Sequence, residues 1–412
     1  MKRNLLTQMR NEWRDNLWLV LELTIVTGVI WFLAIITYGN FYGALEPRGF
    51  QYEDVYTLQS KYIRESSPYH VATPDSVDDF NEDFIQLVHR LRANPHVEAV
   101  GFHQNGISYN YNYHGNFLNR LDVKDSIMYM GNVRMVSPDV VGILGYTSRT
   151  GKTTAQLEDM LRRGELLVAN SISYESNGRD PLDLVGKQVI MNGDSSMVYR
   201  VGDVIQNVRR TDYEKSWGGT IVIPKREDGT ESGDIVLKVR TGHDIGFKED
   251  FRNNSELRRQ RNTYLSDLQK LSDIRKECQR ETENTMRQMA TLIVFLLATV
   301  FLGMLGTFWF RIQQRVGEIA MRKVCGATST DVFRRILGEG MILLAVAVVL
   351  VSALVWSFFS YFSDLFYFCE WKEFLVFELI AVALVGIGIT ASLWYPASRA
   401  MRIEPALALK SE

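Results

Sequence analysis

The chain has 412 residues, with 46 Lys and Arg against 48 Asp and Glu and a formal net charge of −2. That length allows more than one folding unit, and the balanced charge does not indicate a nucleic-acid partner. Three cysteines occur, Cys278, Cys325 and Cys369, and their number and spacing support neither a zinc site nor a disulfide framework, so we interpret them as structural.

The N-terminal 16 residues place Leu5, Leu6, Met9 and Trp13 at helical spacing among arginines. This pattern predicts a cytoplasmic amphipathic helix in the membrane interface. The same residues also suit the cytoplasmic start of the span that follows, and the two readings are compatible.

Four apolar runs are each long enough to cross a bilayer as a helix. The first is too long for a cleaved signal peptide and is not followed by an A-x-A site, so we interpret it as an uncleaved span. Glu22 lies about one turn inside it and is read as an interfacial residue. The roles of Glu22, Glu339 and Glu378 stay open. The predicted spans are residues 17–39, 290–310, 337–362 and 374–395.

A long polar block, residues 40–246, separates the first two spans, and its patterns predict an α/β domain. Ser76 is expected to cap a helix whose apolar face includes Phe84 and Leu87, and Pro95 closes that region. Asn192-Gly193 predicts a tight hairpin turn. Alternating or short apolar runs predict strands at residues 107–113, 133–136, 166–169, 189–191, 198–201, 221–223 and 235–239.

Residues 247–289 have a rough heptad pattern that includes Tyr264, Leu268, Leu271 and Cys278. We predict a helical stalk that continues into the second span and packs against another subunit or against the first span. Several seam positions are polar, which argues against a free-standing coiled coil.

The large domain contains no catalytic constellation. Its histidines show no paired ligand spacing, and we expect no metal site, no bound cofactor and no enzymatic activity in this chain. Gly151-Lys152-Thr153 resembles the end of a phosphate-binding loop, but the upstream Gly145 is one residue too far away for that motif.

Charge sets the predicted orientation. The N-terminal arm, residues 311–336 and the tail at residues 396–412 are rich in Lys and Arg, whereas the short loop at residues 363–373 is acidic. The positive-inside rule therefore places both termini and residues 311–336 in the cytoplasm and the large domain outside. The predicted fold class is an α-helical membrane protein with four transmembrane helices and a large extracytoplasmic α/β domain on a helical stalk.

Residues 311–336 are a short polar segment held between two spans. Glu318 and Arg322 form a favourable i,i+4 pair, Gly326 suits the left-handed end of a helix, and Thr328 with Asp331 fits a capping box. We predict helix, turn, helix, so that a push on the segment moves the second and third spans. An ordinary positively charged loop is the alternative, and the residues alone leave the two readings evenly balanced.

The segment 317–323, GEIAMRK, followed by Gly326-Ala327-Thr328, resembles the coupling segment of MacB/FtsX-type ABC transporter permeases. The tail carries a similar closing motif, with Pro396-Ala397 and Arg399-Ala400. Val136-Ser137-Pro138-Asp139 and Asp180-Pro181-Leu182 resemble parts of that family's extracytoplasmic domain. Ala320 stands where glycine is common, and Cys325 where a larger aliphatic residue is usual.

The resemblance implies a permease of the bacterial inner membrane that works as a dimer, with itself or with a paralogue, on a separate cytoplasmic ATPase that binds ATP and Mg. ATP-driven motion would move the periplasmic domain, a scheme called mechanotransmission, for export or efflux of a peptide, lipoprotein, antibiotic or other amphiphile. A periplasmic adaptor or outer-membrane channel would be a further partner. The alternative is a signalling subunit that activates an extracytoplasmic enzyme or sensor.

Two sets of residues are expected to carry this function. Gly303, Gly306, Gly386 and Gly388 are predicted to let membrane helices approach one another closely. The predicted ATPase-coupling residues are Arg315, Gly317, Glu318, Ile319, Met321, Arg322, Lys323, Gly326, Ala327 and Thr328.

Overall fold

The computed structural model describes residues 13–45, 47–72, 79–110, 112, 114–122, 128–173, 180–213, 219–225, 233–361 and 371–402. The chain divides into two compact units. The helical unit comprises Met1–Phe41 and Glu283–Glu412, and the α/β unit comprises Tyr42–Thr282.

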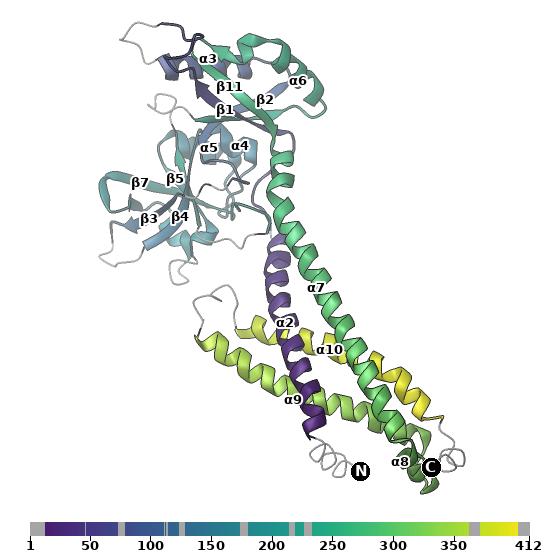
Figure 1. Ribbon diagram of the computed structural model, residues 1–412. Helices are drawn as coiled ribbons and strands as arrows, with labels where there is room; N and C mark the ends of the chain where they lie inside the picture. The colour runs from purple at the N-terminus through teal and green to yellow at the C-terminus, as the bar shows by residue number, and fades with distance from the viewer. Residues whose placement is uncertain are drawn as a thin grey trace. The chain divides into compact units, whose positions relative to one another are not determined.

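Long helices make up the helical unit (Figure 1). Four helices are long and apolar enough to cross a membrane, with mean hydropathies of 2.2 to 2.5, so the four predicted spans are confirmed at this level. Most of the predicted N-terminal amphipathic helix lies outside the described residues. The four long helices are α2 (Trp13–Leu45), α7 (Leu271–Gln314), α9 (Ser329–Tyr361) and α10 (Trp371–Ala400), and the short helix α8 (Val316–Val324) lies between α7 and α9 in the chain.

Apolar side chains from α2, α7, α9 and α10 share one core, in which Ile30, Ala347 and Ile389 are fully buried. Two ring contacts add to this packing near the end of α10. Trp309 stacks on Tyr395 with ring centroids 5.6 Å apart, and the Arg399 guanidinium lies 4.7 Å from the centre of the Trp309 ring. Pro396 lies inside α10, so the predicted tail begins as helix rather than as a separate segment.

The first part of the α/β unit is a pair of strand–helix–strand motifs. Their strands are ordered β11-β1-β9-β2, and every neighbouring pair is antiparallel, which is the ferredoxin-like arrangement. The two-residue edge strand β10 (Arg259–Gln260) pairs with β11. The elements in chain order are β1 (Val55–Tyr62), α3 (Asp79–Arg92), β2 (Val97–Gln104), β9 (Asp234–Val239), α6 (Asp244–Asn253) and β11 (Thr263–Lys270).

Helices α3 and α6 cover one face of this sheet. The helical period of α3 places Phe84, Leu87, Val88 and Leu91 on the buried side, as the sequence predicts, and Phe247 of α6 is fully buried beside them. Ser76, the predicted cap of α3, lies outside the described residues.

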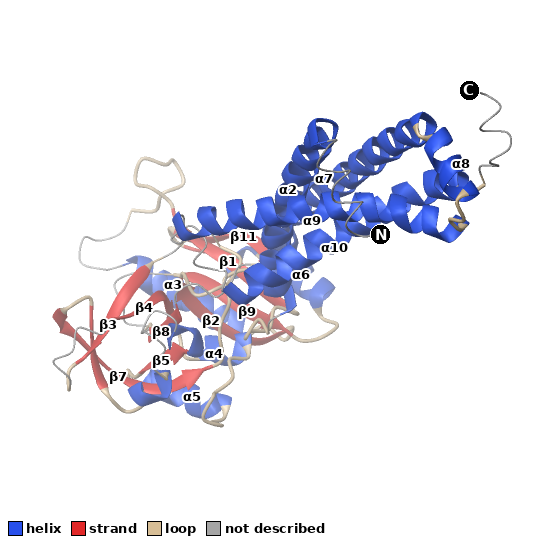
Figure 2. Ribbon diagram, turned by 90° about the horizontal axis from the view of Figure 1, so that it is seen from below, coloured by secondary structure: helices blue, strands red, loops and turns tan. Residues whose placement is uncertain are grey.

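The second part of the α/β unit is inserted between β2 and β9 and closes into a six-stranded barrel. Strands pair in the order β4-β3-β6-β7-β5-β8, and β8 returns to pair with β4. Figure 2 shows the barrel strands β3, β4, β5, β7 and β8 together, and β2 is connected to them by pairing with the end of β4. The barrel strands are β3 (Gly115–Arg120), β4 (Met128–Val136), β5 (Leu166–Ala169), β6 (Gln188–Met191), β7 (Asp194–Ile205) and β8 (Gly219–Pro224).

Short helices and local turns complete the insertion. Asn192 and Gly193 both have positive φ, 52° and 72°, as the hairpin between β6 and β7 requires. Thr153, from the sequence that resembles a phosphate-binding loop, instead forms a capping box with Gln156 at the start of α5. The helical elements are α4 (Asp139–Leu144), α5 (Thr154–Arg162), and the 3-10 turns η1 (Asn170–Ser173) and η2 (Pro181–Leu184), with η3 (Ser255–Leu257) before β10.

Two sequence predictions in this unit are wrong. No strand forms at Ile107–Asn110: Tyr109 adopts a φ of 64°, and its phenol is buried against Asp212, so the tyrosine alternation does not mark a sheet face there. Tyr111 and Tyr113 lie outside the described residues.

The predicted stalk over residues 247–289 is not one helix. Tyr264 and Leu268 belong to β11, which pairs with β1, and the continuous helix begins only at Leu271. The apolar spacing at residues 264–271 suits both a heptad and a strand, and the partner strand about 200 residues earlier decides between them.

Candidate functional site

The segment between α7 and α9 folds as the predicted helix, turn and helix. The chain leaves helical geometry at Arg315 (φ −108°), and the nine residues of α8 follow. Gly326 ends α8 with a φ of 95°. Ala327 N–H then donates to the Arg322 carbonyl, and Gly326 N–H donates to the Lys323 carbonyl, both at 3.0 Å. These paired bonds are the Schellman motif, which explains why glycine is needed at that position.

The next helix begins with a reciprocal cap. The Thr328 N–H donates to Asp331 Oδ2 at 3.0 Å, and the Asp331 N–H donates to Thr328 Oγ1 at 3.2 Å. Each side chain thus satisfies a backbone donor of the other residue. With the Schellman motif on one side and this cap on the other, both ends of the turn have defined geometry.

One face of α8 packs against the other helices. Ile319 is 8% exposed and Ala320 is fully buried, and both lie against the helical-unit core. Ile319 was predicted as an ATPase-coupling residue, but its side chain is part of the core and not of the surface.

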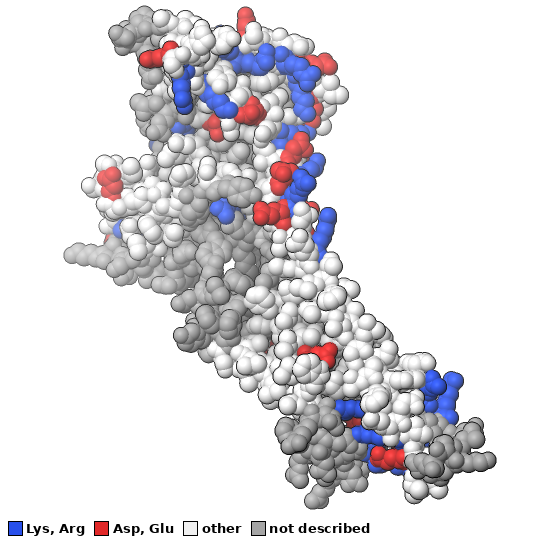
Figure 3. Space-filling model, viewed as in Figure 1, with Lys and Arg blue, Asp and Glu red and all other residues white. Residues whose placement is uncertain are grey.

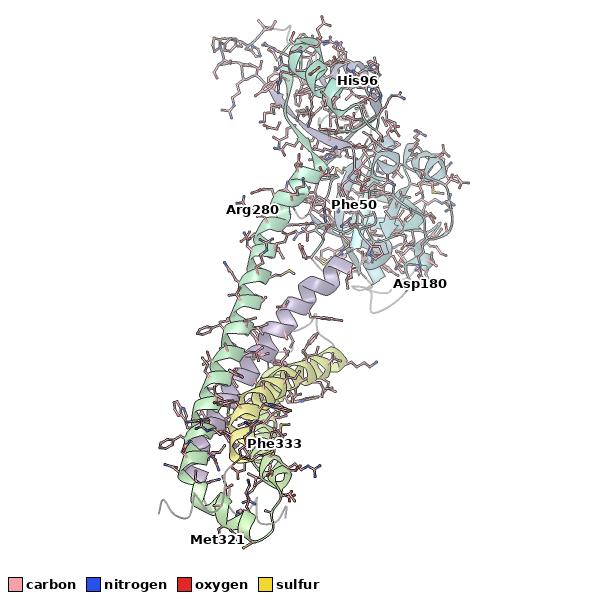
Figure 4. The ribbon with its side chains drawn as sticks, turned by 90° about the vertical axis from the view of Figure 1, so that its right-hand side faces the viewer. Phe50, His96, Asp180, Arg280, Met321 and Phe333 are labelled. Atoms are coloured by element: carbon pink, nitrogen blue, oxygen red, sulfur yellow. The ribbon has the colours of Figure 1, made fainter. Side chains whose placement is uncertain are left out.

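The opposite face of α8 is exposed. Met321 and Val324 are 52% and 60% exposed. Glu318 and Arg322 form the predicted ion pair at 2.5 Å, and each of the two side chains is more than a third exposed. In Figure 4 Met321 lies at the end of the helical unit. We call Glu318, Met321, Arg322, Val324 and Cys325 the α8 face.

The α8 segment is tied to its neighbours by polar contacts. Arg315 pairs with Glu339 of α9 at 3.2 Å. The Lys323 ammonium and the Ser329 hydroxyl both donate to the Met401 carbonyl beyond α10, at 2.6 and 3.1 Å. A displacement of α8 must therefore stretch contacts to α9 and to the end of α10, in addition to its covalent links.

Arginine and lysine side chains gather at this end of the helical unit, as the blue spheres in Figure 3 show. Arg311 donates to Asn16 of α2 at 2.7 Å. This contact extends the polar connections of the segment to the first span.

The predicted coupling residues therefore divide by role. Glu318, Met321 and Arg322 are on the exposed face, whereas Arg315, Lys323 and Thr328 make the internal contacts described above. Gly317 and Ala327 are half-buried, and Gly326 provides the positive φ. Val324 and Cys325 are exposed but absent from the prediction, although their spacing of three or four residues from Met321 places them on the same helical face.

The predicted packing glycines differ in their surroundings. A methyl group on Gly303 would lie 2.9 Å from Glu22 of α2, and one on Gly386 would lie 3.4 Å from Leu344 of α9. Nothing described lies within 4 Å of the corresponding position at Gly306 or Gly388. Gly303 and Gly386 therefore allow close approach of helices within the chain. A helix-packing role for Gly306 and Gly388 remains a prediction.

In the α/β unit, the first turns of α7 are tied to the barrel insertion through Asp212, which is 4% exposed. Arg275 of α7 approaches the carboxylate with Nε at 2.8 Å and Nη2 at 2.6 Å. The Tyr109 hydroxyl donates to it at 2.7 Å, and Arg48 Nε lies 3.1 Å away. The guanidinium groups of Arg48 and Arg275 lie 5.1 and 4.9 Å from the centre of the Tyr52 ring. We call these five residues the Asp212 clamp.

The electrostatics of the clamp favour its charged form. Burial opposes ionisation of Asp212, but the hydrogen bonds from Tyr109 and Arg275 outweigh it and hold the pKa of the carboxyl below its usual range. Burial, together with the bond to Asp212, raises the pKa of Tyr109, which therefore stays a neutral donor.

Histidines that are far apart in the sequence meet in the α/β unit. Nδ1 of His96 lies 2.9 Å from Nδ1 of His243, and His96 Nε2 lies 3.5 Å from Asp250. The sequence spacing gave no sign of this pair because tertiary contact brings the residue before β2 next to the residue before α6. Across the described residues, no group of three His, Cys, Asp or Glu side chains is arranged to hold a metal ion.

Comparison with known proteins identifies the C-terminal part of the chain. Residues 290–405 match the family model described as FtsX-like permease C-terminal. No curated protein matches the chain.

Two solved structures are similar to the α/β part of the chain at low identity. The periplasmic region of MacB from Actinobacillus actinomycetemcomitans matches with 12% identity and a TM-score of 0.33, over 57% of this chain and 96% of that one. The extracellular domain of YknZ, a noncanonic ABC-type transporter from Gram-positive bacteria, matches with 8% identity and a TM-score of 0.31, over 51% and 100%. The family match includes α8 and the helices on either side of it, and the expected resemblance to MacB/FtsX-type ABC permeases is confirmed.

Proposed function

We propose that this chain is the permease subunit of an ABC complex and that a separate cytoplasmic ATPase docks on the α8 face. The observation that carries the proposal is the geometry of α8, a short helix that ends in a Schellman motif and carries exposed Met321 and Val324 and an exposed Glu318–Arg322 pair. Exposed apolar side chains beside charged ones suit a protein partner better than water. ATP and Mg would be bound by that partner, and this chain would not be an enzyme.

The proposed mechanism is mechanotransmission. ATP-driven movement of the ATPases would displace α8, and with it α9 and α10 through Glu339 and the Met401 carbonyl. Helix α7 is continuous from Leu271 to Gln314, so it joins the coupling segment covalently to the Asp212 clamp. On the charge-based orientation the α/β unit lies in the periplasm and both termini lie in the cytoplasm of a bacterial inner-membrane protein.

The permease would pair with a second copy or a paralogue and act in export or extraction of a peptide, lipoprotein, antibiotic or other amphiphile. A periplasmic adaptor or outer-membrane channel would complete an efflux pathway. If deletion of the gene silences an extracytoplasmic enzyme while no compound accumulates in the cell envelope, the signalling alternative holds instead.

The docking test exploits the internal pair on α8. Glu318→Lys and Arg322→Glu should each reduce co-purification of the ATPase, because each reverses a charge on the proposed contact surface. The double variant Glu318→Lys/Arg322→Glu restores an i,i+4 pair but leaves both charges reversed. It should therefore stay defective if the residues contact the ATPase.

Glu281→Lys, an equal charge change at an exposed position of α7, is the matched control and should retain the ATPase. Recovery of binding in the double variant would mean that the pair only stabilises α8. Undiminished binding in all variants would reject docking on this face.

A further inference from the structure

A cavity of about 690 Å³ lies in the α/β unit, between the segment that follows β1 and the residues around β10 and β11. The described residues that line it contribute arginine, tyrosine and serine side chains and two aliphatic residues, and none of them is Asp or Glu. The side chains that matter for its chemistry are Tyr62, Arg64, Tyr69, Arg258, Arg259 and Tyr264.

Both walls of the cavity are held in place. Arg259 donates to the Tyr69 carbonyl and to the Arg261 carbonyl, each at 2.9 Å. Asn262 is fully buried and exchanges two hydrogen bonds with the backbone of Val71, at 2.8 and 2.9 Å. These contacts connect the segment after β1 to the residues between β10 and β11.

The opposite wall is secured from α3. Arg90 donates to the Glu256 carbonyl at 2.8 Å and to the Gln260 side chain at 2.5 Å. The cavity therefore needs little ordering when a ligand enters, which lowers the entropic cost of binding.

Positive charge in the cavity is not balanced by described carboxylates. Arg258 Nε is buried and has no hydrogen-bond partner among the described residues. Arg64 likewise forms no ion pair with any described carboxylate, whereas Arg261, just outside the cavity, pairs with Asp83 at 2.6 Å. A buried donor on a charged group costs free energy until an acceptor reaches it.

We propose that this cavity binds an oxyanion, a phosphate or a carboxylate, carried on a ring-bearing small molecule. The planar guanidinium groups of Arg64 and Arg258 suit the oxygens of either anion. Tyr62 and Tyr69, 39% and 72% exposed, offer ring faces for an aromatic or sugar ring. The volume is within the usual range of small-molecule sites, roughly 300–1,000 Å³.

Phenyl phosphate is the probe, because it combines a ring with a phosphate. Its binding to the full chain in detergent is measured by isothermal titration calorimetry. Saturable binding that weakens with added salt is expected, with weaker binding of inorganic phosphate and none of benzyl alcohol. Displacement by dihexanoyl phosphatidic acid would indicate a lipid headgroup as the natural source of the anion, and displacement by glucose 6-phosphate a soluble sugar phosphate.

Arg258→Gln and Arg64→Gln should each weaken phenyl phosphate binding about tenfold or more, the effect of losing a charge-assisted hydrogen bond. Arg120→Gln, which removes an arginine already paired with Asp122 on the barrel, is the control and should bind as the parent does. Arg64 lies in the segment after β1 and outside any helix or strand, so that variant keeps the test valid if Arg258→Gln fails to fold.

No saturable binding at millimolar phenyl phosphate, or equal loss in the Arg120 control, would overturn the proposal. The inference goes beyond the proposed function. Binding is measured without the ATPase, so its failure leaves docking on α8 untouched, and a failure of docking leaves this site untouched.

Discussion

Replacing Asp212 with asparagine removes the charge at the centre of the Asp212 clamp while preserving the shape of the side chain. The carboxylate receives contacts from Arg275, Arg48 and Tyr109 and is 4% exposed. Breaking a buried ion pair by removing one partner costs about 3–5 kcal/mol. Asparagine keeps one acceptor oxygen, and the arginines are about a quarter to a third exposed. We therefore expect the free energy of unfolding to fall by about 3 kcal/mol, the lower end of that range.

For a unit of this size, that loss corresponds to a fall in unfolding temperature of roughly 6–12 °C. Differential scanning calorimetry of the full chain in detergent measures it, and hydrogen exchange localises it, since the amides of residues 271–279 should exchange faster. Asp159→Asn is the matched control: its partner Arg163 and Asp159 itself are more than half exposed, so the change should cost less than about 1 kcal/mol.

The pH dependence of the free energy of unfolding is a second test of the contacts made by Asp212. The folded pKa of Asp212 is depressed, so its contribution is present above the unfolded pKa of about 3.9 and is lost as pH falls through the folded value. The parent should therefore lose this stabilisation only in acid, and Asp212→Asn should lack it at neutral pH. A variant that melts with the parent, or no lower than Asp159→Asn, would refute the reasoning.

Three further outcomes are expected. Gly326→Ala places a side chain at φ 95° and should lower the unfolding temperature of the helical unit, at a cost of about 1 kcal/mol; an unchanged transition would contradict the role of the Schellman turn. Val324→Asp should weaken ATPase capture with no change in unfolding temperature, whereas full capture would remove Val324 from the docking surface. Burial, with Arg134 and Lys225 nearby, lowers the pKa of His103 to about 3. The unfolded state therefore binds the proton more readily, and the free energy of unfolding falls as pH drops from about 6.5 towards 3. By pH 5 the loss should be about 2 kcal/mol, measured as a fall in unfolding temperature that His103→Gln does not show; an equal fall in that variant would assign the acid sensitivity to other groups.

The features that sequence reasoning predicted correctly depend on short stretches of chain. Four apolar runs are enough to place the spans, and Gly326 with Thr328 and Asp331 is enough to place the turn between α8 and α9. The Asn192-Gly193 hairpin likewise needs only two residues with positive φ. Such features are decided by propensity, capping and hydropathy within a few turns of helix or one hairpin.

The errors come from patterns that satisfy two local structures at once. Tyr264, Leu268 and Leu271 fit a heptad, yet the first two lie on a strand because β1 offers a partner edge. The tyrosine alternation around Tyr109 looks like a strand, but the buried Asp212 carboxylate holds that phenol in a loop. In both cases the local residue pattern fits either structure, and contacts between distant residues made the choice.

The candidate site shows the same division. Its position, its helical character and its Glu318–Arg322 pair follow from neighbouring residues, and so does the resemblance on which the proposed ATPase partner rests. Which side of α8 is exposed does not follow, because burial of Ile319 and exposure of Val324 depend on where α9 and α10 pack.

By itself, then, the sequence of this protein determined four helices long and apolar enough to cross a membrane, a large α/β insertion and a capped helical turn between the second and third of those helices. Only the tertiary structure decided the ferredoxin-like strand order, the closed barrel, the Asp212 clamp and the arginine-lined cavity. Each of these joins segments more than 80 residues apart. Hydropathy and capping act through neighbours in the chain, whereas strand pairing and buried charge pairs depend on long-range packing.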